Sequence, residues 1–439
     1  MSSDGRRVFL FLQGPPSTFA AELAGELERL GHRTLRINLA AGDRFHWRRR
    51  GAFNYKGRFE DWGDYVGAFM AREGVTDLVF YADRLPYHRI AAAHARARGI
   101  SVTAFEFGYL RPDWITLERD GMGVYSHFPA DAATILANGR GLAEPDPIVR
   151  YGYAFHTEAF NEVVYNLANV FLPFLHPHYR SDTYYHPVHD YLSWIPRLVS
   201  GWLGAPKAKA VIARLVAGST PYYVLPMQLQ SDYQIRDNAP FDHLGEVVRI
   251  VMESFAANAP ADGRLVVKVH PLDNGIENWP KVARRIAREV GIAGRIDVID
   301  GGNLYELLGR ARGCIVVNST VGLHALRLGC PVAVLGVAVF DVPGLTFQGP
   351  LDRFWMGATP PDPALRDTFV RLLAAATQVK GCFYTAEGRA AGVREAARRL
   401  VERRVNEPGG YVDPPPRLRR AAALGMDAAV DTVPPPGGR

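Results

Sequence analysis

Hydrophobic and polar residues alternate along the first third of the chain in blocks that predict strands and helices in turn. Three short apolar runs, Val8–Leu12, Thr76–Tyr81 and Ser101–Glu106, have the length and composition of buried strands. Between them, Phe19–Leu30 and His88–Arg98 place apolar residues at helical spacing. This βαβα order predicts a parallel sheet with helices on both of its faces.

The same order returns in the second half of the chain. The apolar runs that predict strands there are Tyr222–Leu225, Arg264–His270, Cys314–Asn318 and Pro331–Leu335. Helical spacing predicts helices at Leu244–Ala256, Trp279–Val290, Leu304–Ala311 and Gly322–Leu328, and a largely helical stretch over 361–404. We therefore expect an α/β protein with two facing Rossmann-like domains, the B-type (GT-B) architecture of glycosyltransferases.

Two segments depart from this order. Residues 151–218 are rich in aromatic and His residues and predict a helical insertion, whereas residues 406–439 contain two runs of three prolines and predict a flexible tail. The expected division of the chain is an N-terminal Rossmann-like domain at 1–150, the helical connecting segment at 151–218, a C-terminal Rossmann-like domain at 219–380, a helix at 381–405 and the flexible tail at 406–439.

Composition narrows the class of protein. With 439 residues, of which 48% are hydrophobic and 22% charged, the chain has the composition of a folded enzyme rather than of a disordered protein. A net charge of +6 favours anionic partners such as nucleotides, phospholipid surfaces and acidic sugars, without choosing among them. The three cysteines lack the spacing of a zinc site. No signal peptide or membrane-spanning pattern stands out, so we expect a cytoplasmic protein.

Polar residues follow two of the predicted strands, at the sheet edge where open α/β sheets bind ligands. The run Lys268–Pro271 ends one strand, and its cationic side chains suit the phosphate of a nucleotide, although a His at a strand end is as often structural. The run Asn318–Gly322 leads from a strand directly into a helix, whose free N–H groups can hold phosphate. A plain helix cap formed by Ser319 or Thr320 is the alternative.

Two carboxylates occupy comparable loops. Asp232 follows the strand at Tyr222–Leu225 and can attack or stabilise a cationic sugar centre, since sugar transfer passes through an oxocarbenium-like state. A helix cap is the commoner role of a lone Asp. Glu106, at the end of its strand, can act as general base toward an acceptor hydroxyl across a cleft. A salt bridge to Arg111 is the alternative, and the two roles are compatible.

Taken together, these four segments resemble the capsule polysaccharide biosynthesis and export proteins of Gram-negative bacteria. These are β-Kdo (3-deoxy-manno-octulosonate) transferases, and the resemblance covers about residues 5 to 380 and is strongest to the smaller, single-transferase type. The run Glu106–Arg111 is similar to a Glu-x-Gly-Phe/Tyr-x-Arg segment of that family. Gln230–Asp232 is similar to its Gln-x-x-Asp loop, with a spacing one residue shorter. Lys268–Pro271 and Asn318–Gly322 match its donor-binding strand ends.

The resemblance implies a function and a set of roles. It implies transfer of Kdo from CMP-Kdo, held by the second domain, to a lysophosphatidylglycerol-type lipid with retention of configuration. Asp232 would be the nucleophile or cation stabiliser, Glu106 would serve the acceptor, and His270 would assist departure of CMP. The donor-binding residues would be Lys268, His270, Pro271, Asn318, Ser319, Thr320, Gly322 and Gln230. No metal or other cofactor is expected, because CMP-Kdo has no diphosphate and no Asp-x-Asp lies near the cleft strands.

The expected partners are a nucleotide-sugar donor, a lipid or glycolipid acceptor, a capsule assembly or export complex and the inner-membrane surface, but no nucleic acid. The basic clusters Arg48–Arg50 and Arg417, Arg419 and Arg420 can serve that surface, although a solvated charged face explains them equally well. Two other functions fit the same residues. One is a non-catalytic export component that binds the nascent polysaccharide, and the other is a transferase that uses a UDP- or GDP-sugar.

Overall fold

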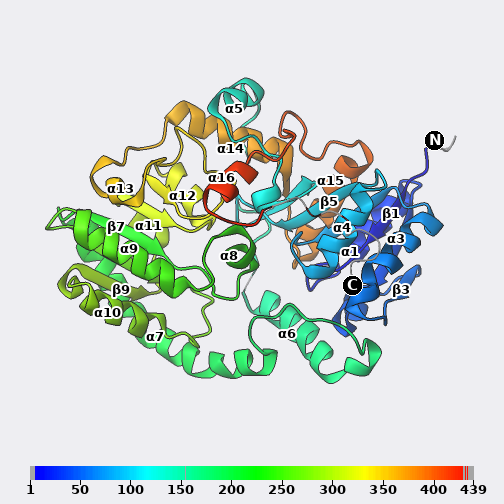
Figure 1. Ribbon diagram of the computed structural model, residues 1–439, viewed down its shortest axis with the longest axis horizontal. Coiled ribbons are helices and arrows are strands. Elements are labelled where there is room, and N and C mark those ends of the chain that lie inside the picture. The colour runs from blue at the N-terminus through cyan, green and yellow to red at the C-terminus, as the bar shows by residue number, and fades with distance from the viewer. Residues whose placement is uncertain (1–4, 154, 429–430, 432, 434–439) are drawn as a thin grey trace.

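The chain folds into two α/β domains that lie side by side, as the sequence predicts (Figure 1). The computed structural model describes residues 5–153, 155–428, 431 and 433. Each domain is built on a largely or entirely parallel sheet covered by helices on both faces. Within the described residues, none of the helices combines the length and the apolar character that crossing a bilayer requires.

The first domain contains a seven-stranded sheet in the order β12-β6-β5-β4-β1-β2-β3. Its strands are β1 (Val8–Phe11), β2 (Arg33–Asn38), β3 (Ala52–Asn54), β4 (Asp77–Tyr81), β5 (Ser101–Phe107), β6 (Trp114–Arg119) and β12 (Gln378–Lys380). All neighbours are parallel except β6, which runs antiparallel to both β5 and β12. The helical elements up to residue 139 are α1 (Phe19–Arg29), α2 (Ala41–His46), η1 (Phe59–Asp61), α3 (Trp62–Glu73), α4 (Pro86–Arg96), η2 (Gly123–Tyr125) and α5 (Ala132–Gly139).

The second domain contains a five-stranded parallel sheet in the order β11-β10-β7-β8-β9. Its strands are β7 (Tyr222–Pro226), β8 (Arg264–Val269), β9 (Ile296–Asp300), β10 (Gly313–Val316) and β11 (Val332–Val334). The helices are α8 (Tyr233–Asn238), α9 (Leu244–Asn258), α10 (Trp279–Glu289), η4 (Ala293–Arg295), α11 (Leu304–Leu308), α12 (Val321–Arg327), α13 (Leu351–Gly357) and α14 (Pro363–Thr377).

The apolar runs form strands because they are buried on both sides. Val224 and Val266 pack into the core on one face of the second sheet, whereas Leu225 and Val267 pack into the core on the other. Strands buried on both faces have continuous apolar sequences. The parallel strands β7, β8 and β10 also end at one edge, so the polar loops that follow them are gathered there.

The connecting segment is helical, as predicted. It consists of α6 (Phe155–Phe171), the short helix η3 (Pro173–Leu175) and the long helix α7 (Pro187–Ala217). These elements run along one side of both domains (Figure 1).

After α14 the chain returns to the first domain, which the sequence did not predict. β12 pairs with β6 in the first sheet, and α15 (Ala386–Val401) packs against α1. The predicted domain at 219–380 is therefore wrong at its end, and the helical stretch expected over 361–404 is interrupted by a strand. A three-residue edge strand has too short a pattern to stand out from the flanking helices.

The flexible tail predicted at 406–439 is contradicted by residues 406–428, which pack against both domains. The segment contains α16 (Leu418–Ala423) and crosses between the domains (Figure 1). Arg417 is 2% exposed. Its guanidinium donates to backbone carbonyls of Phe128 and Pro129 on one side and of Ala338 and Val339 on the other. Prolines disfavour helices and strands, but a segment that contains them can still pack against a folded domain. The buried Arg417 guanidinium is satisfied because backbone carbonyls accept its hydrogen bonds.

Burial also excludes Arg417 from the membrane-facing cluster expected for Arg417, Arg419 and Arg420, because its guanidinium lies inside the protein. The second proline run, residues 434–436, lies outside the described residues.

Candidate active site

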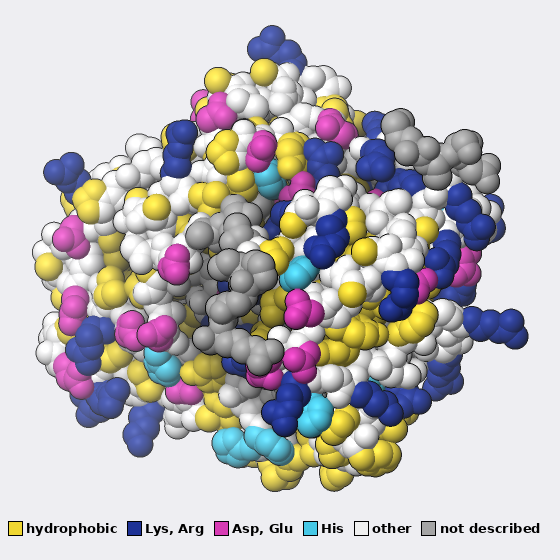
Figure 2. All heavy atoms as spheres, turned by 45° about the vertical axis from the view of Figure 1, so that its right-hand side comes forward, with side chains coloured by type: hydrophobic (Ala, Val, Ile, Leu, Met, Phe, Trp, Pro, Cys, Tyr) yellow, Lys and Arg dark blue, Asp and Glu magenta, His cyan; other side chains and the backbone are white. Residues whose placement is uncertain are grey.

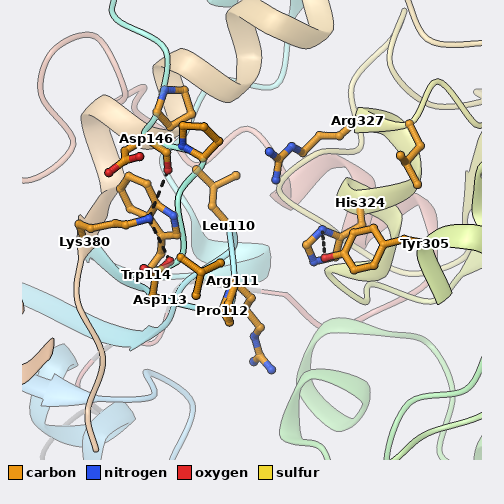
Figure 3. A pocket seen from close by; sticks show the side chains of 14 residues that line it. Leu110, Arg111, Pro112, Asp113, Trp114, Asp146, Tyr305, His324, Arg327 and Lys380 are labelled. Carbon is orange, nitrogen blue, oxygen red and sulfur yellow. Dashed lines mark hydrogen bonds and ion pairs between the residues drawn. The ribbon is translucent and has the colours of Figure 1, made fainter. Parts of the chain in front are cut away.

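The loop between β5 and β6 meets α11 and α12 of the second domain at a cleft of about 330 Å³. In Figure 3, Arg111, Trp114 and Lys380 lie on the side of the first domain, and His324 and Arg327 lie opposite on the side of the second. Residues from both domains therefore line one cavity, as the facing-domain arrangement requires.

Gly108 makes this loop tight enough to carry Arg111 toward the cleft. The Gly108 N–H donates to the carbonyl of Trp114 at 2.8 Å. A Cβ at Gly108 would lie 2.5 Å from the backbone of Trp114, which is too close for any side chain. The glycine in the run Glu106–Arg111 is therefore required by the turn itself.

The cleft is rich in cationic groups. The ammonium of Lys380 lies 3.0 Å from the Asp113 carboxylate, which balances its charge. Within the described part of the chain, neither Arg111 nor Arg327 forms an ion pair. Burial, together with the charges of Arg327 and Arg111, lowers the pKa of His324 to about 4, so this ring is neutral at pH 7. Two unpaired guanidinium groups make the cleft a favourable place for an anion.

Glu106 lies next to this loop and contacts α8 of the second domain. The Tyr233 hydroxyl donates to Glu106 Oε2, and the Gln234 side-chain amide approaches the same oxygen at 3.4 Å. Burial raises the pKa of Glu106 to about 7, and the Asp232 charge adds to this effect, whereas the Tyr233 hydrogen bond opposes it. Glu106 forms no salt bridge with Arg111 among the described residues. Its partner is instead a tyrosine from the facing domain.

Asp232 is the N-cap of α8. Its Oδ1 accepts from the Gln234 backbone N–H at 2.9 Å, so the cap interpretation of this residue holds. Burial raises the pKa of the Asp232 carboxyl, while the Gln234 N–H and the charge of Arg111 oppose that rise. Because Tyr233 and Gln234 follow directly, the cap also holds Asp232 close to Glu106. Two carboxyl groups, one from each domain, therefore lie near the junction.

His270 follows β8 at the same edge of the sheet. The Leu272 backbone N–H donates to its Nδ1 at 3.1 Å. Burial and the charges of Arg111 and Lys268 lower the pKa of His270 to about 4, so the ring is neutral at pH 7. A neutral ring that accepts at Nδ1 carries its proton on Nε2, which leaves one donor for a ligand. Burial also lowers the pKa of Lys268, and Asp300 opposes this.

Arg111 connects these groups. Its charge acts on the carboxyl of Asp232 and on the rings of His270 and His324, in each case after the effect of burial. The charge of Asp232 acts in turn on Glu106. Asp232, Glu106 and His270 are thus each within electrostatic range of the Arg111 guanidinium.

The sequence model of a family described as capsule polysaccharide biosynthesis protein matches residues 76–384 of this chain. The chain belongs to that family. The matched range includes Glu106, Asp232, His270 and the cleft residue Lys380.

The chain is 30% identical to the capsule polysaccharide export protein KpsS of Escherichia coli, over 86% of this chain and 96% of that protein. It is also 30% identical to the capsule polysaccharide modification protein LipB of Neisseria meningitidis serogroup B, over 86% of this chain and 91% of that protein. One similar solved structure is KpsC of Thermosulfurimonas dismutans, a β-Kdo 2,7 transferase, at 14% identity and a TM-score of 0.44, covering 90% of this chain and 99% of that one.

Asn318 supports the site rather than facing it. Its amide N–H groups donate to the backbone carbonyls of Gln234 at 2.7 Å and Asn238 at 3.2 Å. Its side-chain oxygen accepts from Gln228 at 2.9 Å. These bonds hold α8, and with it Asp232, against the end of β10.

The rest of the run 318–322 starts a helix. The Ser319 hydroxyl accepts from the Val321 N–H at 3.2 Å, as in the helix-cap alternative, whereas Thr320 makes no side-chain cap bond. A Cβ at Gly322 would lie 2.6 Å from the Phe340 ring. Close packing against Phe340 therefore explains why this position is a glycine.

The Gln230 side chain also forms its hydrogen bonds within the protein. Its side-chain oxygen accepts from the Leu244 N–H at 2.8 Å, and its amide donates to the Asp242 carbonyl at 3.1 Å. It is 2% exposed and fastens the loop to the start of α9, so direct donor binding by Gln230 is not supported. Pro271, in contrast, is exposed after the end of β8.

Sequence reasoning missed several residues of the cleft and of the domain junction beside it. Arg111 stood in a recognised motif but was considered only as a partner of Glu106. Tyr233 directly follows Asp232, yet nothing in the sequence indicates that its hydroxyl reaches Glu106 across the junction. Arg327 and Lys380 come from a helix and an edge strand that only the tertiary fold brings to the cleft. Among the residues that the structure describes, no group of three His, Cys, Asp or Glu side chains is placed to hold a metal ion.

Proposed function

We propose that this capsule-family protein is a retaining glycosyltransferase that transfers Kdo from CMP-Kdo to a lysophosphatidylglycerol-type lipid acceptor. The observation that carries the proposal is the meeting of two carboxyl groups from opposite domains, because Tyr233, which donates to Glu106, directly follows Asp232 in the chain. Membership of the family supports a role in capsule polysaccharide biosynthesis.

The charge of the cleft supports an acidic sugar donor. CMP-Kdo carries a phosphate and a sugar carboxylate, and both need cationic or dipolar partners in a site that excludes water. Arg111 and Arg327 offer unpaired guanidinium groups within the described chain. The Nε2 proton of His270 can donate to a phosphate oxygen, because its Nδ1 is already occupied by the Leu272 N–H. His270 would thereby stabilise CMP as it leaves.

The proposed reaction has two displacements. The Asp232 carboxylate attacks the anomeric carbon as the bond to the CMP phosphate breaks, which forms a covalent glycosyl–enzyme and releases CMP. The acceptor hydroxyl then loses its proton to Glu106 and attacks the same carbon, and the bond to Asp232 breaks. Each displacement inverts the anomeric configuration, so the product retains that of the donor.

The surroundings of the two carboxyl groups fit these roles. Burial raises the pKa of Asp232, the proposed nucleophile, and the Gln234 N–H and the charge of Arg111 counter this rise in favour of the ionised form. A pKa of about 7 suits Glu106 as a general base at neutral pH. Among the described residues, Glu106 accepts both of its side-chain hydrogen bonds at Oε2, so Oε1 is left for an acceptor hydroxyl.

The test is a transfer assay with CMP-Kdo and a short-chain lysophosphatidylglycerol acceptor. Asp232→Asn should reduce the rate by at least about 10³-fold, as expected for a nucleophile. Glu106→Gln should reduce it by about 10²-fold or more. Asp237→Asn is a matched control, because Asp237 lies in the same short helix, and its rate should stay close to that of the wild type.

Undiminished transfer by the Asp232→Asn protein would overturn the proposal. A non-catalytic export component would release no CMP with any acceptor. Thermal-shift measurements with CMP, UDP and GDP separate the possible donors, because a ligand that binds only the folded state raises the melting temperature. Stabilisation by UDP or GDP without stabilisation by CMP would exclude Kdo as the sugar.

A further inference from the structure

The helical connecting segment exposes an unusual number of large apolar side chains. Phe160 on α6 and Phe171 at its end are 69% and 68% exposed, and Phe174 on η3 is 68% exposed. Leu192 and Ile195, near the start of α7, are 60% and 64% exposed. These five residues are called the apolar edge below. Exposed apolar side chains that gather on one segment mark an interaction surface.

The exposed aromatic residues of α6 lie on the side opposite to its protein contacts. Phe160 and Phe171 are eleven residues apart, about three helical turns, and therefore project from the same face. The contacts with α2 lie on the opposite face. There the Asn169 side chain accepts from the Gly42 N–H at 2.7 Å, and the Tyr165 ring stacks on His46. The helix is thus anchored on one face and apolar on the other, as in helices that lie at a membrane surface.

Cations flank the apolar edge. His176, directly after η3, donates from its Nδ1–H to the Tyr55 carbonyl, 2.8 Å away. Two cations lie in this region, since Lys56 directly follows Tyr55 and Arg44 is on α2, which packs against α6. Arg180 lies over the Phe59 ring, 4.9 Å from its centroid.

Arg44, Lys56 and Arg180 are exposed, and none of them forms an ion pair within the residues that the structure describes. The exposed carboxylates Glu60 and Asp61 on η1 offset part of this charge. Figure 2 shows the combination along the lower edge of the molecule, where hydrophobic and His side chains gather beside Lys and Arg.

We propose that the apolar edge and its flanking cations dock on the surface of an anionic phospholipid bilayer. The aromatic and aliphatic side chains would enter the boundary between headgroups and acyl chains, and Arg44, Lys56 and Arg180 would meet the lipid phosphates. A second copy of the chain is a poorer occupant, because symmetric pairing would bring these unpaired cations together. The inference deepens the proposed function, since a lipid acceptor is reached at a membrane, but the docking itself needs neither donor nor acceptor.

The test is flotation of the full-length protein with vesicles. Two compositions are compared: pure phosphatidylcholine, and phosphatidylcholine with about a third phosphatidylglycerol. The wild type should float with the anionic vesicles, and about 0.5 M NaCl should weaken this binding because it screens the cations. Phe171→Ser/Phe174→Ser should weaken binding about tenfold or more. Arg44→Glu/Lys56→Glu should abolish the preference for anionic vesicles.

Two control variants alter comparable side chains on the second domain. Met356→Ser removes a side chain of α13 that is 75% exposed, and Lys281→Glu reverses an exposed charge on α10. Both should float like the wild type. Equal flotation of the wild type and both double variants, or no flotation of the wild type, would overturn the proposal.

A wild-type dimer that becomes monomeric in Phe171→Ser/Phe174→Ser, measured by light scattering, would also overturn it and assign the surface to self-association. Transfer to a water-soluble acceptor should be unchanged in both double variants. If the wild type transfers no sugar to that acceptor, the proposed function is rejected. Binding of the protein to anionic vesicles would still support the docking proposal.

Discussion

The hydrogen bond from Tyr233 to Glu106 provides the sharpest test of the junction between the domains. It joins the end of β5 in the first domain to α8 in the second. Burial raises the pKa of Glu106 to about 7, and the Tyr233 hydroxyl holds it below the value that burial alone would produce. Tyr233→Phe removes this donor and leaves the ring, so the pKa of Glu106 should rise further.

The size of the rise follows from the strength of the bond. A hydrogen bond to a charged group contributes about 1.5–3 kcal/mol. At about 1.4 kcal/mol for each pKa unit, its loss raises the pKa of Glu106 by about 1–2 units. The active form of a general base is the carboxylate, so the wild-type rate should increase as the pH rises through about 7. In the variant the same increase should appear about 1–2 pH units higher.

The assay is the initial rate of CMP release with saturating acceptor, measured from about pH 5.5 to about pH 9.5. Tyr185→Phe serves as the control, because Tyr185 donates to another carboxylate, Glu277, at 2.8 Å. Its profile should overlay that of the wild type. An acidic limb in Tyr233→Phe that stays at the wild-type pH would refute either the hydrogen bond or the role of Glu106 as base.

Four other predictions test the fold and the donor site. Arg417→Ala should lower the free energy of unfolding by about 3 kcal/mol, because buried carbonyls lose their donor, whereas the exposed Arg419→Ala should change it by less than about 0.5 kcal/mol in denaturant titrations. Gly322→Ala should cost about 1–3 kcal/mol by overpacking against Phe340 while the folded protein keeps its affinity for CMP, measured by calorimetry. His270→Ala should weaken CMP binding about tenfold, and unchanged affinity would reject its contact with the phosphate. EDTA treatment should leave the transfer rate unchanged, and a rate restored only by a divalent cation would reject metal independence.

The sequence by itself determined the parts of the fold that depend on local pattern. Continuous apolar runs such as Tyr222–Leu225 and the start of β8 are stable as strands when both of their faces are buried. Such strands are typical of parallel sheets, so the sequence alone indicates this kind of sheet. β9 was not predicted because it is an edge strand that contains the polar residue Asp297, which forms ion pairs with Arg214 and Arg264. A partly polar strand lacks the continuous apolar pattern by which the buried strands were predicted.

The same local reasoning located the loops that carry Asp232 and His270. In a parallel sheet, loops that follow neighbouring strands share one edge, so their approach to each other follows from the order of elements. Local reasoning did not determine which polar side chains in these loops form their hydrogen bonds within the protein and are therefore not available to a ligand. Gln230 and Asn318 look like ligand-binding amides in the sequence, but their hydrogen bonds hold the loop and α8 in place.

Only the tertiary structure decided the contacts between residues far apart in the chain. Lys380 reaches Asp113 because the chain returns to the first sheet after α14, and Tyr233 reaches Glu106 because the two domains close on each other. Arg417 is buried because carbonyls from both domains converge on it. The physical reason is common to all three. Hydrophobic periodicity reports how each segment is buried, whereas a polar contact between distant segments depends on the relative placement of whole elements, which no local pattern encodes.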